Sequence, residues 1–361
     1  MSNFVKFGIL GCGPRGMQMA RVLQLLPDLA ALCAMSDTDP VNLKKASREF
    51  SGVSFYDSSD ALIESGLVDA VITEIPPAVH TEYVVKALDC GIHVLGEIPA
   101  VDSLEEGRLL WEKVNSSRAL YMCGSNPHYR AKTALLIKLK EKGLIGKVAY
   151  IETEYMHDMR TCNDEWRKTY ETCRYCTHSL GPVLRLLDND EFISVACMST
   201  GDHFNCGRDH NAMSALLKTR KNVVVRFLTG FALPYAGPAH TTKIYSEKGI
   251  LELRNESARI WLEDLNGFSA RREFLEIPLT PQSSDRPGTM KILDEGLFRA
   301  ASYGHNGSDL LMVRDFVEAI WKGSLSPIGV KDALAMTLPG IYAALSAREG
   351  GAIQQIKYPW T

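Results

Sequence analysis

The feature that most constrains this chain is a glycine-rich turn at residues 11–16, directly after the short apolar run Val5–Leu10. In such a turn Gly11 allows the tight bend, Gly13 lets the backbone approach a pyrophosphate, and Gly16 lets helix and strand pack closely. The helix that follows offers unpaired backbone N–H groups and the positive end of its dipole to phosphates. The turn therefore predicts a dinucleotide site.

The second apolar run points to the identity of the dinucleotide. It ends at Asp37, about 20 residues beyond the turn, where an acidic side chain can accept hydrogen bonds from ribose hydroxyls. A carboxylate there favours NAD over NADP, because it would repel a 2′-phosphate. Arg15, inside the turn, leaves NADP as the less favoured alternative, since its guanidinium could meet a phosphate.

Apolar runs and amphipathic segments alternate through about residue 125, the pattern of a doubly wound parallel sheet. Beyond that point several alternating strands follow with few crossover helices, which predicts an open, largely antiparallel sheet. We expect an α/β chain with a Rossmann domain over residues 1–125 and a substrate-binding and oligomerisation α+β domain over residues 126–361.

Composition limits the partners. The formal charge is −3, from 40 basic and 43 acidic residues, which gives no reason to expect binding to nucleic acid or to a membrane surface. We expect a cytoplasmic location, because no apolar stretch is long enough to span a bilayer and no signal-type segment is recognised. An odd number of cysteines, nine, argues against a disulfide framework.

Two stretches of the first domain carry a family resemblance: residues 68–83, with Pro76-Pro77-Ala78-Val79-His80, and residues 87–99, ending in Glu97-Ile98-Pro99. With the glycine turn they resemble the Gfo/Idh/MocA oxidoreductases, which oxidise sugars and related polyols with NAD(P) and frequently form dimers or tetramers. That family usually has Glu-Lys-Pro where this chain has Glu97-Ile98-Pro99. An isoleucine exchanges no proton, so either another group performs the transfer or the activity is lost.

Motifs of the second domain narrow the resemblance. Residues 126–129, 154–160, 166–167, 175–182 and 304–309 are similar in succession to the NAD-dependent glycosidases of glycoside hydrolase family 109, which also have an apolar residue in place of that lysine. The gut-bacterial enzymes that oxidise C3 of glycosides, and leave bond cleavage to a separate lyase, are a further branch that this reading does not separate from the first.

The local motifs predict part of the site, and the resemblance adds Tyr129, Arg167, Tyr175 and His178. Those expected to contact the cofactor are Gly11, Gly13, Pro14, Arg15, Gly16, Asp37, Pro76, His80, Glu97, Pro99 and Asn126. Those expected to contact a sugar or glycoside substrate are Tyr129, His157, Trp166, Arg167, Tyr175, His178 and His305. His80, His157 and His305 each keep a structural alternative. A metal site at Cys173/Cys176 is not expected, because no second cysteine pair or histidine pair accompanies them.

The chemistry then needs one base and one acid. His178 is the preferred base, because its unperturbed pKa lies near neutrality, and Tyr129 or Tyr175 could serve instead if the positive charge of an oxidised nicotinamide lowered its pKa. We expect oxidation of a sugar-ring hydroxyl, C3 of a glycoside in particular. One alternative is a redox-assisted glycosidase in which oxidation, β-elimination, hydration and reduction recycle the NAD. A second alternative is an NAD-binding regulatory protein without catalysis.

Overall fold

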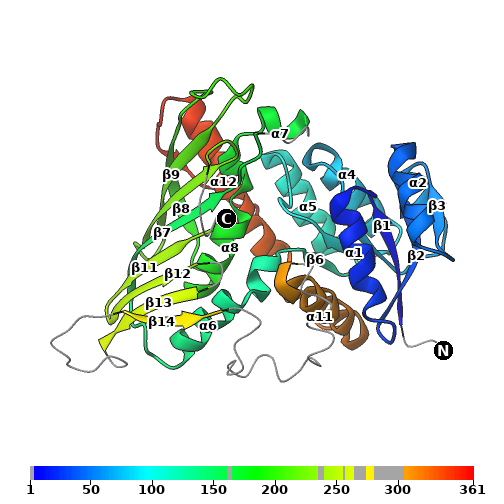
Figure 1. Cartoon of the computed structure of the whole chain (residues 1–361), viewed down its shortest axis with the longest axis horizontal. Coiled ribbons are helices and arrows are strands. Elements are labelled where there is room, and N and C mark those ends of the chain that lie inside the picture. Colours follow the sequence, from blue (N-terminus) through cyan, green and yellow to red (C-terminus); the bar gives the residue numbers. More distant parts are fainter. Residues whose placement is uncertain (1–3, 161–164, 235–239, 255–256, 264–273, 280–304) are drawn as a thin grey trace. The chain divides into compact units, whose positions relative to one another are not determined.

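The computed structural model describes residues 4–160, 165–234, 240–254, 257–263, 274–279 and 305–361 (Figure 1). The chain forms two compact units. The first holds Met1–Tyr129 and Leu293–Leu334, and the second holds Arg130–Ile292 and Ala335–Thr361.

The first unit is built on a parallel sheet of six strands in the order β3-β2-β1-β4-β5-β6. The strand order reverses between β1 and β4, and ligands of such sheets bind at that point, beyond the carboxyl ends of the strands. The strands are β1 (Val5–Leu10), β2 (Ala30–Ser36), β3 (Ser54–Tyr56), β4 (Ala70–Thr73), β5 (His93–Gly96) and β6 (Tyr121–Cys123). The helices are α1 (Pro14–Gln24), α2 (Pro40–Glu49), α3 (Ser59–Ile63), α4 (Pro77–Asp89), α5 (Leu104–Ser116), η1 (Asn126–Tyr129), η4 (His305–Gly307) and α11 (Ser308–Lys322).

The predicted Rossmann domain is confirmed, but its extent differs from the predicted residues 1–125. Residues 293–334 also belong to this unit, so the remainder of the chain is not one continuous domain. The reason lies in α11, whose apolar face is buried, with Phe316 fully buried and its ring centroid 6.1 Å from that of Phe7 on β1. A helix with such a face is stable only where a core covers it.

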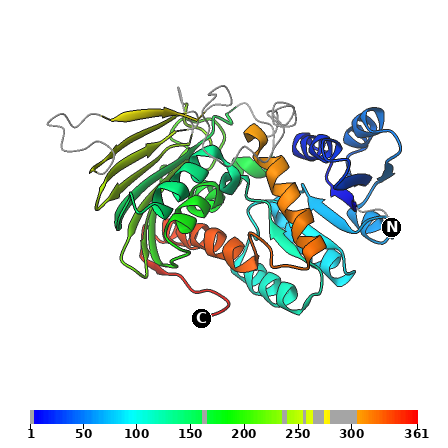
Figure 2. The same cartoon turned by 90° about the horizontal axis from the view of Figure 1, so that it is seen from below.

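The second unit is built on a mixed sheet of nine strands in the order β14-β13-β12-β11-β7-β10-β9-β8-β15. Only the β7–β10 pair is parallel among the described strands, so the predicted, largely antiparallel sheet is confirmed. Figure 2 shows these strands as one layer, with α6 and α8 on one face. The strands are β7 (Val148–Met156), β8 (Phe192–Ser199), β9 (Ala212–Thr219), β10 (Val224–Gly230), β11 (Thr242–Ser246), β12 (Gly249–Leu253), β13 (Ser257–Leu262), β14 (Leu275–Pro278) and β15 (Gln354–Gln355).

Helices of the second unit carry several of the predicted site residues, among them Arg167, Tyr175 and His178. These helices are α6 (Ala131–Glu141), α7 (Glu165–Thr169), η2 (Thr172–Tyr175), α8 (Thr177–Leu186) and α12 (Val330–Arg348), the last of which begins in the first unit. Within the described residues no helix has both the length and the apolar character needed to cross a bilayer.

Candidate functional site

The glycine turn has the geometry that a bound pyrophosphate requires. A Cβ on Gly16 would lie 1.9 Å from the carbonyl oxygen of Gly11, and one on Gly11, where φ is +98°, would lie 2.3 Å from the carbonyl oxygen of Glu74. Both positions therefore require glycine. A Cβ on Gly13 would meet nothing within 4 Å, so the protein leaves open space beside the uncapped start of α1. That space is what a dinucleotide phosphate would fill.

Asp37 directly follows β2 and contacts this turn at Cys12. Its carboxylate accepts hydrogen bonds from the backbone N–H groups of Cys12 and Asp39, each at 2.8 Å, and from the side-chain amide of Asn42 at 3.2 Å. These donors hold the carboxylate at the carboxyl end of the strand, at the position where an acid meets a ribose.

Arg15 contacts carboxylates of the protein. Its guanidinium lies 2.7 Å from Glu97, 3.8 Å from Glu74 and, in a two-point contact of 2.6 and 3.0 Å, against Asp309. Burial raises the pKa of Glu74 well above its usual value, and the charge of Glu97 adds to this effect. Asp309 is fully buried, which by itself would raise its pKa, but the hydrogen bond from His305 and the charge of Arg15 hold that pKa well below its usual value. The predicted contact of Arg15 with the cofactor remains a prediction.

The other residues expected at the cofactor lie near the carboxyl ends of the strands. Pro14 is the first residue of α1, and Pro76 immediately precedes α4. Glu97 and Pro99 follow β5, and an oxygen of Glu97 accepts a hydrogen bond from the backbone of Ile98 at 2.9 Å. Asn126 begins η1, and its amide lies 3.4 Å from the ring of His305, which contacts Asp309 at 3.0 Å. His305, expected at the substrate, therefore lies in the first unit beside Arg15 and Asp309.

His80 has the environment of a structural histidine. It is 2% exposed, and its Nε2 lies 2.6 Å from the hydroxyl of Thr73. Burial lowers its pKa to about 4.

This burial makes stability depend on pH. Between pH 6.5 and about 4 the unfolded chain binds a proton at His80 that the folded chain does not, so the free energy of unfolding falls as the pH falls through this window. The contribution amounts to about 3 kcal/mol across the window. We expect the free energy of unfolding of His80→Gln, measured by urea denaturation, to depend less on pH between 7 and 4. An equal pH dependence in both proteins would show that His80 is not the group responsible.

In the second unit, His178 and Tyr175 lie in an aromatic cluster around Tyr155. Ring centroids of Tyr155 lie 4.7 Å from His178, 5.3 Å from Tyr175 and 4.3 Å from His240, and the last pair is stacked. The His157 ring is nearly parallel to both, with its centroid 5.6 Å from Tyr155 and 5.9 Å from His240. Three of the residues expected from the sequence are thus brought together: His157 directly after β7, Tyr175 in η2 and His178 in α8.

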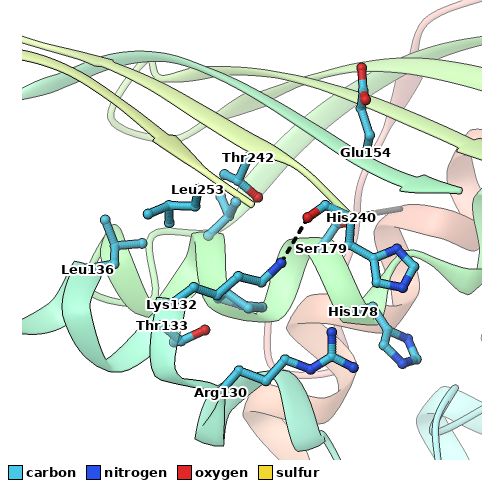
Figure 3. Close-up of a pocket in the computed structure, with 12 residues that line it drawn as sticks. Arg130, Lys132, Thr133, Leu136, Glu154, His178, Ser179, His240, Thr242 and Leu253 are labelled. Atoms are coloured by element: carbon cyan, nitrogen blue, oxygen red, sulfur yellow. Dashed lines mark hydrogen bonds between the residues drawn. The ribbon is translucent and has the colours of Figure 1, made fainter. Parts of the chain in front are cut away.

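A pocket opens beside this cluster, with about 430 Å³ of space between its lining atoms, part of it open to solvent (Figure 3). His178 and Ser179 line it from α8, and Lys132 lines it from α6. Lys132 donates a hydrogen bond to the backbone carbonyl of His240 at 3.0 Å. The pocket therefore combines an imidazole with cationic groups in one partly enclosed space.

Trp166 and Arg167 lie on α7, outside the residues that line this pocket. The guanidinium of Arg167 lies over the Trp166 ring at 4.4 Å, and Trp166 meets Tyr170 edge-on at 5.2 Å. Tyr129 ends η1 in the first unit. The predicted roles of these three residues therefore remain predictions.

Cys173 in η2 and Cys176, which directly follows it, are fully buried. Burial raises the pKa of Cys176 to about 12 and that of Cys173 well above its usual value, so both are protonated thiols. Within the parts of the chain that the structure describes, no three histidine, cysteine or acidic side chains are grouped to hold a metal.

Sequence reasoning missed Tyr155, Lys132 and His240 as residues of this site. Tyr155 had one usable signal, since it lies two residues before His157 at the end of a strand and so faces the same side. Lys132 looks like one of several lysines on the face of a helix, and nothing near His240 in the sequence distinguishes it.

Comparison with known proteins finds a family match in the first unit and relatives that align with both units. Residues 5–125 match the Gfo/Idh/MocA family, described as an oxidoreductase family with an NAD-binding Rossmann fold. A glycosyl hydrolase family 109 protein of Solibacter usitatus is 26% identical over 98% of this chain and 87% of its own. An alpha-N-acetylgalactosaminidase of Bacteroides fragilis is 26% identical over 51% of this chain and 48% of its own.

Solved structures share the fold along nearly the whole chain. A levoglucosan dehydrogenase in complex with NADH and levoglucosan has a TM-score of 0.83 at 17% identity, over 98% of this chain and 99% of its own. A scyllo-inositol dehydrogenase of Lactobacillus casei, with NAD(H) and scyllo-inositol, has a TM-score of 0.75 at 17% identity over 98% and 99%. With its strand order, its glycine turn and the match over residues 5–125, the chain carries a Rossmann domain of the Gfo/Idh/MocA oxidoreductase family.

Proposed function

We propose that this protein uses NAD to oxidise a ring hydroxyl of a sugar, and specifically C3 of a glycoside. The observation that carries the proposal is the pocket of the second unit, where His178 lies against Tyr155 and Tyr175 in a chain that also has an NAD-binding domain. The sugar complexes of the dehydrogenases with the same fold support it.

His178 would take the hydroxyl proton. Its ring stacks near Tyr175 at 5.1 Å and 24°, which orients the imidazole at the pocket wall. A bound NAD, held at the glycine turn and Asp37, would supply the hydride acceptor. The base would be needed here in particular, because the buried Ile98 stands where the family's lysine would be and cannot exchange a proton.

A second candidate is a redox-assisted glycosidase. It is favoured by the family 109 relative that aligns with 98% of this chain. After C3 becomes a ketone, the proton at C2 is acidic, and its loss expels the C1 substituent. Tyr175, beside His178, would protonate the leaving oxygen, and hydration and hydride return would complete hydrolysis without net redox change.

One experiment separates the two candidates. Purified protein is incubated with NAD and a panel of methyl and aryl glycosides, while NADH absorbance and product masses are followed. The oxidase yields NADH and a product two mass units lighter than the glycoside. The glycosidase yields free sugar and aglycone without accumulating NADH. If no glycoside gives either set of products although the protein binds NAD, the regulatory alternative is supported.

The cofactor site has its own prediction. Gly13→Ala places a methyl group in space that the protein leaves open, so stability should not change, whereas the methyl should crowd the pyrophosphate. We expect the Kd for NAD to rise about 10–100-fold. Calorimetric titration with NAD and a thermal unfolding scan measure both quantities. An unchanged Kd would place the pyrophosphate elsewhere.

A further inference from the structure

The pocket of the second unit is rich in groups that carry positive charge. Its titratable and charged lining groups are Arg130 and Lys132 at the start of α6, Glu154 on β7, His178 on α8, and His240 just before β11. Four of the five are cationic or can become so. A neutral sugar hydroxyl needs no such concentration of cations, whereas an anion is stabilised by it.

The single carboxylate of the lining is engaged outside the pocket. Glu154 accepts hydrogen bonds from Arg226 at 3.2 Å and from the Thr241 hydroxyl at 3.0 Å. In Figure 3 its side chain points away from Lys132. It therefore does not serve as a counter-ion for Lys132.

Lys132 is left with a neutral partner. Its ammonium donates to the backbone carbonyl of His240, and in the described part of the chain no carboxylate pairs with it. Burial, and then the charge of Arg130, lower its pKa to about 7. An amine in this state gains strongly from a nearby anion, because the anion restores the charged form.

We propose that this pocket is an anion subsite, in which Lys132 and Arg130 bind a carboxylate, sulfate or phosphate carried by the sugar substrate. The inference rests on the proposed function, which puts a sugar at the same pocket beside His178. It narrows the substrate class to acidic glycosides, such as uronides or sugars esterified with sulfate or phosphate. Each of these anions accepts hydrogen bonds from Lys132 and Arg130 in the same way.

Binding tests the subsite without requiring turnover. NAD-loaded protein is titrated calorimetrically with methyl glucoside and with its 6-carboxylate, 6-sulfate and 6-phosphate counterparts. At least one anionic sugar should bind about 10–100-fold more tightly than the neutral one, as expected for a hydrogen-bonded charge pair. The three anionic arms identify which group is preferred.

Variants assign the effect to Lys132. Lys132→Met should remove the preference for the anionic sugar, and Lys132→Arg should retain much of it. Lys138→Met, on the same helix but outside the pocket, is the matched control and should bind as the unmodified protein does. A thermal scan of each variant verifies folding.

The pKa of Lys132 gives a readout that does not depend on affinity. Competitive acetylation at a series of pH values, read by mass spectrometry, should show Lys132 titrating near 7 and shifting upward by a unit or more when the anionic sugar is bound. Equal binding of neutral and anionic sugars, with no shift, would overturn the proposal. If anionic sugars bind and shift Lys132 but no NADH forms from any of them, the subsite stands and the proposed oxidation fails.

Discussion

Replacing His178 by alanine is expected to lower kcat about 10²–10⁴-fold, the usual contribution of a positioned general base. The ring lies at the pocket wall against Tyr155 and Tyr175, so its removal takes away the proton acceptor and leaves the cofactor domain untouched. Alanine is a good helix former at the start of α8, and the fold should persist. NADH formation on the substrate found by the glycoside panel measures the loss, and calorimetry confirms NAD binding.

Two further measurements make the result specific. Free imidazole added to His178→Ala should restore part of kcat, because it can occupy the vacated space and accept the proton. His210→Ala is the control, since His210 lies near the surface against Ser199, outside the pocket. A rise in KM with an unchanged kcat would show that His178 binds the substrate without exchanging the proton, and Tyr129 or Tyr175 would then be the base to test.

The sequence predicted the fold correctly where a local pattern is compatible with only one backbone structure. The glycine turn after Val5–Leu10 predicted the β1–α1 geometry, since the close contacts at Gly11 and Gly16 exclude any side chain. Elements too short for a periodic pattern were missed. Of these, β3 (Ser54–Tyr56) spans three residues and α3 (Ser59–Ile63) five, so neither shows a recognisable repeat.

The rest of the site depends on contacts between distant segments. Lys132 and His240 are 108 residues apart and meet only because α6 packs near the start of β11. In the sequence Lys132 lies in the same helix as Lys138 and Lys140, and several lysines in one helix suggest side chains exposed to solvent, not a pocket residue. Similarly, nothing local to Asp309 shows that it pairs with Arg15, 294 residues away, and this pairing adds to the apolar contacts of α11 within the first unit.

That pairing leads to the second large effect, on stability. Arg15→Met leaves Asp309, which is fully buried, without its guanidinium partner, and leaves the carboxylates of Glu97 and Glu74 close together. Breaking a buried ion pair by removing one partner costs about 3–5 kcal/mol. We expect the free energy of unfolding of the first unit, measured with urea, to fall by that amount. The loss should be smaller at acidic pH, because the carboxylates left without a partner become protonated there.

A matched variant lies on the same helix. Arg21 makes a similar two-point contact with Glu49, at 2.6 and 2.9 Å, but both side chains are largely exposed, so Arg21→Met should cost at most about 1 kcal/mol. The double variant Arg15→Met/Asp309→Asn should recover part of the stability, because the buried charge is removed with its partner. If Arg15→Met instead raised the Kd for NAD and left unfolding unchanged, Arg15 would act on a cofactor phosphate, and its contacts with Glu97 and Asp309 would give way when NAD binds.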